Sequence, residues 1–233
     1  AGVKLARRAS GCKKTYIAIE DNKPDAIEAM QNALDNTKNA EGIEIVPVKT
    51  RYPQGGERQL INSVLEKTVP TGGIPPMIGL VVLNVATVAA IAEAVVIENP
   101  LTHRVVTVTG EGIANPGNYY VPIGIPVETL IETCGGLTDD AIRVVMGGPM
   151  MGIAVADFTT PLTKTSGALA CLTESQVRQI KFAGRQTPCI RCGRCLQACP
   201  EHLNPTKIAH AVKHYMLERA NDYYISACIE CGC

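Results

Sequence analysis

Cysteine is concentrated at the C-terminal end of the chain, where seven of its ten cysteines follow position 188. The run Cys189-Ile-Arg-Cys192-Gly-Arg-Cys195-Leu-Gln-Ala-Cys199-Pro200 has the C-x2-C-x2-C-x3-C-P spacing that ligates iron–sulfur cubes. Three thiolates at successive three-residue steps wrap one face of a cube, and the fourth cysteine points to a second cube. Zinc fits this spacing poorly because it takes paired C-x2-C or Cys/His ligands. The run therefore predicts [4Fe-4S] ligands, with a structural zinc site as the alternative.

A second run, Cys228-Ile-Glu-Cys231-Gly-Cys233, occupies the last residues of the chain. By the same spacing its third ligand falls one position beyond Cys233, so we interpret Cys233 as the neighbour of a ligand. If the fourth cysteine of each run crosses to the other cluster, Cys199, Cys228 and Cys231 hold three corners of one cube. Each cube then lacks a ligand. Together with the Ala1 start, this predicts a fragment truncated at both ends, with incomplete cluster ligation.

The charge balance excludes some partners. Lys plus Arg (22) equals Asp plus Glu (22), which disfavours nucleic acid because its binders need excess positive charge. Ten cysteines in 233 residues are too few for a secreted disulfide scaffold. Cys12, Cys134 and Cys171 lie outside the two runs and are predicted to be small core residues. His210 and His214 are four residues apart, which on a helix is more typical of a solvated face than of a metal site.

The first hundred residues alternate strand and helix patterns, as in a parallel sheet covered by helices. We expect strands at 15–20, 43–48 and 79–83, and helices after residue 24, after residue 57 and over about 85–96. The stretch 78–97 is apolar enough to be mistaken for a membrane span. Its β-branched first half and the preceding Pro75-Pro76 favour a buried strand followed by a buried helix. This part is therefore predicted to be an α/β domain.

From residue 102 the pattern changes to short strands and turns, typical of an α+β module. Predicted strands are 104–109, 119–121 and 143–146, with a turn at 115–118 and a short helix that contains Val127, Leu130 and Ile131. After Thr173 the pattern is helical, interrupted by the cysteine runs. The sequence thus predicts three domains, at 1–100, 101–172 and 173–233.

Two loops of the first domain lie at expected strand ends that lead into helices, where open α/β sheets bind ligands. The loop 52–57 contains Gly55 and Gly56, which let the backbone approach a ligand closely. The loop 84–87 opens the expected 85–96 helix. Helix starts offer free N–H groups to a phosphate or a ring oxygen. Both loops are candidate binding sites, although a turn of this composition is more often only a turn.

Five further segments are distinctive: YPQGGERQLI, GGIPPMIGLVVLNVATVAAI, RVVTVTGEGIANPGNYYVPIGIPV, GGLT and RVVMGGPMMG. With the cysteine runs, they make residues 14–233 resemble the C subunit of the Rnf complex, an ion-translocating ferredoxin:NAD oxidoreductase. More distantly, the chain is similar to the NADH- and FMN-binding subunit of respiratory complex I. The resemblance implies a partial Rossmann-like α/β domain, a β-grasp module of the SLBB type and a helical two-cluster ferredoxin-like [4Fe-4S] domain.

The resemblance also implies FMN, two [4Fe-4S] clusters and NAD(H) as substrate, in an electron-transfer subunit bound peripherally at the cytoplasmic side of the cell membrane. Its partners would be the other Rnf subunits, with ferredoxin reached through them. The implied FMN residues are Tyr52, Gly55, Gly56, Glu57, Asn84 and Thr87, and the cluster ligands are Cys189, Cys192, Cys195, Cys199, Cys228 and Cys231. The family's glycine-rich phosphate loop has no counterpart here, so we expect weak or no FMN binding by this chain alone.

Other functions fit some of the same features. A related flavin and iron–sulfur cobalamin reductase shares this order of modules, but the segments CIRCGRC, CIECGC and GGPMMG favour the Rnf subunit. A non-catalytic iron–sulfur relay would use the first two domains only for docking, and would lack flavin and NADH-dependent dye reduction. A zinc-stapled interaction module would contain zinc without sulfide.

Overall fold

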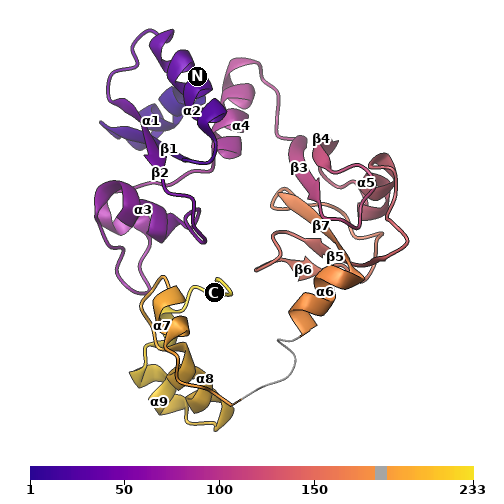
Figure 1. Ribbon diagram of the computed structural model, residues 1–233. Coiled ribbons are helices and arrows are strands. Elements are labelled where there is room, and N and C mark those ends of the chain that lie inside the picture. The colour runs from indigo at the N-terminus through magenta and orange to yellow at the C-terminus, as the bar shows by residue number, and fades with distance from the viewer. Residues whose placement is uncertain (182–187) are drawn as a thin grey trace. The chain divides into compact units, whose positions relative to one another are not determined.

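The computed structural model describes residues 1–181 and 188–233 (Figure 1). The chain divides into two compact units. The first contains Ala1–Pro100 and Leu196–Cys228, and the second contains Leu101–Cys195 and Ile229–Cys233. Both units are thus built from segments that lie far apart in the sequence.

The first unit is built on a parallel pair of strands, β1 (Thr15–Glu20) and β2 (Ile43–Val48). α2 (Pro24–Asp35) connects them, beginning at Pro24, where a missing N–H costs no helical hydrogen bond. α3 (Glu57–Leu65) follows β2 and buries Ile61. These two strands and two helices confirm the predicted β–α pattern.

Just beyond the C-terminal ends of β1 and β2, hydrogen bonds link Asp21 to Thr50. The Asp21 carboxylate accepts hydrogen bonds from the Thr50 hydroxyl at 2.8 Å and from the Thr50 backbone N–H at 2.9 Å. Because these bonds favour the ionised carboxylate, they lower the pKa of Asp21. The carboxyl edge of the two-stranded sheet is therefore fixed by polar contacts.

The third predicted strand does not form. Residues 79–83 have no strand pairing, and the 3-10 turn η1 (Pro75–Ile78) ends at Gly79 with a φ of 72°. A strand needs a neighbouring edge for its backbone N–H and C=O groups. In the described part of the first unit the sheet consists of β1 and β2, and Val81 and Leu83 are exposed. The prediction of a buried strand here is wrong.

α4 (Val85–Val96) forms where predicted, but it is not buried. Val85, Val95 and Val96 are 68%, 61% and 62% exposed. α1 (Gly2–Ser10), which was not predicted, packs on α4, and a Cβ on Gly2 would lie 1.9 Å from the carbonyl oxygen of Val88. Only glycine permits this approach. Among the described residues, no helix is long and apolar enough to cross a membrane.

The second unit contains a five-stranded sheet with the order β4-β3-β7-β5-β6. The strands are β3 (His103–Thr109), β4 (Gly117–Pro122), β5 (Ala141–Met146), β6 (Ile153–Ala154) and β7 (Ala168–Thr173). β3 and β7 are parallel, and the other neighbours are antiparallel. The strands predicted at 104–109, 119–121 and 143–146 are confirmed. β6 and β7 were not predicted.

The core of the second unit forms between this sheet and α5 (Val127–Thr133), the predicted short helix. Val127 and Leu130 are fully buried. Cys134 and Cys171 are fully buried in the same core, as predicted, and burial raises the pKa of the Cys171 thiol to about 11. Cys12, predicted to be a core residue, is instead only half-buried.

The helical pattern predicted after Thr173 is confirmed for the described residues. Residues 182–187 of the expected 173–233 domain lie outside the described residues. The helices are α6 (Glu174–Lys181), α7 (Arg194–Ala198), α8 (Pro205–Lys213), α9 (Leu217–Asp222) and the 3-10 turn η3 (Ile225–Ala227). Asn204 caps α8 by accepting from Lys207 N–H at 3.1 Å. Within the first unit, Gln59 on α3 donates to Glu201 at 2.5 Å.

Candidate functional site

The two cysteine runs share one backbone conformation. In the first, Arg191 has a φ of 57° and Gly193 a φ of 74°. In the second, Glu230 and Gly232 stand at the same offsets from their cysteines, with φ values of 53° and 79°. Each run thus has a left-handed residue before its second cysteine and another after it. The repetition indicates that both runs form the same kind of ligand loop.

Backbone N–H groups face two of the predicted ligand sulfurs. Arg191 N–H donates to Cys189 Sγ at 3.4 Å, and Leu203 N–H donates to Cys199 Sγ at 3.3 Å. Hydrogen bonds to ligand sulfurs tune the potential of a bound cluster. The donor chemistry of these loops therefore fits thiolate ligation of a metal centre.

The exposure of the predicted ligands varies. Cys189, Cys192 and Cys228 are exposed, Cys195 and Cys199 are half-buried, and Cys231 is buried. Cys233, predicted to be the neighbour of a ligand, is exposed. Within 1–181 and 188–233, no three His, Cys, Asp or Glu side chains lie close enough together to hold a metal ion. Cluster ligation therefore stays a prediction.

The predicted flavin loop 52–57 lies at the start of α3. Gly56 is the N-cap residue and makes no side-chain cap hydrogen bond to the first N–H groups of α3. A Cβ on Gly55 would meet nothing within 4 Å, which leaves its backbone open to an approaching group. Tyr52 is 50% exposed, and Glu57 is the first residue of the helix. The expected helix start is confirmed, and the roles of these residues stay a prediction.

Gln54, in the same loop, was not singled out from the sequence. It is 3% exposed, and its Oε1 accepts from Arg51 Nε at 3.2 Å. That bond fixes the orientation of the amide, and its Nε2 is the one buried side-chain polar atom without a partner among the described residues. A polar residue in a Pro-x-Gly-Gly turn is normally exposed, so no sequence signal pointed to it.

The second predicted flavin loop lies at the start of α4. Asn84 is the N-cap residue, and its Oδ1 accepts from Ala86 N–H at 2.9 Å, so its carbonyl oxygen already has a structural role. Thr87 is exposed in the first turn of the helix. The expected position at a strand end is wrong, because no strand precedes Asn84. The expected position at a helix start is confirmed.

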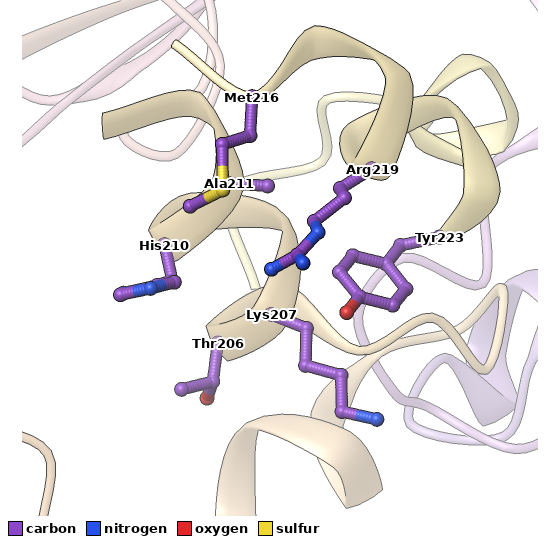
Figure 2. Close-up of a pocket in the computed structure, with 7 residues that line it drawn as sticks. All are labelled: Thr206, Lys207, His210, Ala211, Met216, Arg219 and Tyr223. Carbon is purple, nitrogen blue, oxygen red and sulfur yellow. The ribbon is translucent and has the colours of Figure 1, made fainter. Parts of the chain in front are cut away.

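A cavity of about 220 Å³ lies elsewhere, between α8 and α9 (Figure 2). It is lined by Thr206, Lys207, His210, Ala211, Met216, Arg219 and Tyr223. The His210 and His214 rings lie 4.4 Å apart on α8. None of the predicted flavin residues lines this cavity, and it is smaller than the roughly 300 Å³ at which small-molecule sites begin.

Comparison with known proteins defines the class of the chain. Residues 1–93 match the Nuo51 FMN-binding domain family, and residues 105–154 match the SLBB domain family. Two crystal structures of an NAD+-reducing [NiFe]-hydrogenase share this fold. The air-oxidised form has a TM-score of 0.65 at 23% identity over 90% of this chain and 42% of that one. The chain thus combines an FMN-binding-type α/β domain with an SLBB domain.

Curated relatives narrow the class further. The chain is 41% identical to the C subunit of the proton-translocating ferredoxin:NAD(+) oxidoreductase complex of Clostridium ljungdahlii, over 96% of this chain and 47% of the relative. It is 38% identical to the C subunit of the Na(+)-translocating complex of Acetobacterium woodii, over 94% and 48%. The chain is therefore similar to the C subunits of ion-translocating ferredoxin:NAD(+) oxidoreductase complexes. It spans about half the length of the curated relatives it matches.

Proposed function

We propose that this chain is part of an electron-transfer subunit that passes electrons between NAD(H), FMN and two [4Fe-4S] clusters in a membrane-associated ferredoxin:NAD oxidoreductase. The subunit would lie peripherally at the cytoplasmic side of the membrane and contact the other subunits of the complex. The combination that carries the proposal is a Nuo51-type domain at 1–93 in a chain that ends in two cysteine loops of one backbone form.

The flavin part of the proposal rests on the loop before α3. The N–H groups at the start of α3 lack a side-chain cap, and the Gln54 amide has a donor without a partner. Acceptor atoms of a phosphate or a ring carbonyl match both features. FMN, when bound, accepts two electrons as a hydride and releases them singly to one-electron carriers. Tyr52 would offer an aromatic face, and Gly55 would allow close approach of the backbone.

The cluster part of the proposal rests on the thiol loops. Cys189, Cys192 and Cys195 would hold one cluster, while Cys199, Cys228 and Cys231 would hold three corners of the other. The helical region would then be ferredoxin-like, and the SLBB domain would be a β-grasp module. The N–H bonds to Cys189 and Cys199 would stabilise the reduced, more negative cluster.

Flavin content in a full-length subunit with this sequence tests the flavin site. We expect Tyr52→Ala to lose most bound FMN and NADH-dependent dye reduction, because it removes the aromatic face. Tyr120→Ala removes another exposed tyrosine, from the second unit, and should change neither. At Asn84, serine keeps the helix cap but removes the amide, whereas alanine removes both. Full flavin in Tyr52→Ala, Asn84→Ala and Asn84→Ser would refute the assignment of the pocket.

A further inference from the structure

The cavity between α8 and α9 has a basic lining that the proposed function does not use. Lys207 and Arg219 carry positive charge at neutral pH, and His210 adds two ring nitrogens. Lys207 and His210 come from α8 and Arg219 from α9, so the two helices bring the three side chains to one cavity. Figure 2 shows Arg219 and Lys207 on the same side of the helix pair, with the Tyr223 ring beside them.

Among the described residues, no carboxylate forms an ion pair within 4.0 Å with Lys207 or Arg219. In the part of the chain that the structure describes, the one ion pair within 4.0 Å joins Lys23 to Glu20, in the first unit and far along the sequence. Lys207 is instead held over the Tyr223 ring, with its Nζ 5.4 Å from the ring centre. Two like charges on one small cavity repel each other until an anion is placed between them.

The rest of the lining suits a small oxyanion. Ala211 is buried and Met216 half-buried, so they add apolar surface to the lining, whereas Thr206, Lys207 and Arg219 are exposed. The Thr206 hydroxyl lies in the first turn of α8. The Arg219 guanidinium offers a planar fork of donors, and Lys207 offers a point charge. The volume of about 220 Å³ admits one such group but not a whole nucleotide.

We propose that the α8–α9 cavity binds a phosphate group, with Arg219 and Lys207 as its charged ligands and Thr206 and Tyr223 as hydroxyl donors. The phosphate is either a free inorganic anion or the phosphate end of a small ester whose organic part stays outside the cavity. Two full positive charges match a phosphate dianion better than a single carboxylate. This site does not depend on the flavin or on the clusters.

Nuclear magnetic resonance of the full chain tests the site, with inorganic phosphate as the probe and sodium chloride holding the ionic strength constant. We expect saturable shifts of backbone amides within 204–223 at millimolar phosphate. Lys207→Gln and Arg219→Gln should each raise Kd about tenfold, because each removes a charged hydrogen-bond partner. Lys213→Gln removes a positive charge from the same helix outside the cavity and should leave Kd within about twofold.

Two further titrations identify the source of the phosphate. AMP that competes with inorganic phosphate, while adenosine does not, would assign the site to the end of an ester. If neither AMP nor adenosine competes with inorganic phosphate, the site binds the free anion. Two results would overturn the proposal. The first is the absence of saturable shifts in the wild-type chain. The second is an equal Kd in wild type, Lys207→Gln and Arg219→Gln, with all other amide signals unchanged.

Discussion

At the scale of single residues, the buried Nε2 donor of Gln54, which has no partner among the described residues, lowers the free energy of unfolding of the chain without a ligand. A buried donor without an acceptor costs about 1–3 kcal/mol. We therefore expect Gln54→Leu to leave the free energy of unfolding unchanged or to raise it by up to about 1 kcal/mol, even though it also removes the bond from Arg51. Ile61→Ala, at an equally buried site of α3, should lose about 2–4 kcal/mol.

Urea unfolding of the three proteins measures this difference. A Gln54→Leu loss as large as that of Ile61→Ala would show that the Gln54 amide is fully satisfied in the folded chain. Such a result would remove one of the two observations that make the loop before α3 a ligand site. The flavin proposal would then rest on the uncapped start of α3 alone.

Cys171 makes the stability of the second unit depend on pH. Burial raises the pKa of its thiol from 9.0 to about 11, so the folded state holds the proton more tightly than the unfolded state. The resulting stability is present below pH 9 and is lost as the pH rises through about 11. Burial also raises the pKa of Cys134, and the hydrogen bond to Cys134 raises that of Tyr119, so both act in the same direction.

Urea midpoints between pH 8 and pH 11 check this expectation. Cys171→Ala should lower the midpoint at pH 8, because it leaves a cavity, and should reduce the loss on going to pH 11. Val144→Ala, at the strand position paired with Cys171, removes core volume without a titrating group and should keep the wild-type slope. Identical slopes in wild type and Cys171→Ala would contradict the account.

At the scale of elements, two glycines that follow strands separate backbone strain from steric clash. Gly110 has a φ of 109°, and a Cβ there would lie 1.9 Å from the Cys171 carbonyl oxygen. Gly124 has a φ of 96° but nothing within 4 Å of its Cβ position. We expect Gly110→Ala to destabilise the second unit by about 3 kcal/mol or more, and Gly124→Ala by about 1 kcal/mol. Equal losses in thermal or urea unfolding would show that the β3–β7 approach relaxes easily.

The same scale shows what the sequence could and could not predict. β1, α2, β2, α3 and α5 were predictable because their apolar periodicity and their turns agree with the structure around them. The segment 79–83 has the composition of a strand, yet it pairs with neither β1 nor β2, and pairing depends on the rest of the fold. β7 was missed because ALACLT is a short apolar run, which does not by itself indicate a strand. Its pairing with β3 on one side and β5 on the other depends on the fold.

The candidate sites, too, could be predicted from the sequence only in part. The spacing of the cysteine runs could be read directly, and the shared left-handed positions at Arg191 and Glu230 add what spacing does not show. Gly55 and Gly56 could be identified as candidate site residues because they precede a predicted helix. The buried Gln54 amide and the capping role of Asn84 could not, because both depend on where a side chain turns inside a loop.

At the scale of the whole molecule, different parts of the chain match different families. A Nuo51-type domain precedes an SLBB domain, and the two cysteine runs are contributed by the C-terminal region. Electron transfer between a two-electron donor and single-electron centres needs both a flavin and clusters. The thiol loops are therefore the part on which the whole account depends, because without metal–sulfur clusters the flavin would have no one-electron acceptor within the subunit.

The most direct test is the iron, zinc and acid-labile sulfide content of the full-length subunit, purified without oxygen. We predict about eight iron and about eight sulfide per chain, with no stoichiometric zinc, since two cubes each hold four of both. Cys192→Ser should lower both values by about half, whereas Cys171→Ser, in the core of the second unit, should lower neither value per folded chain. Zinc without sulfide would contradict the account and would make the C-terminal region a structural module.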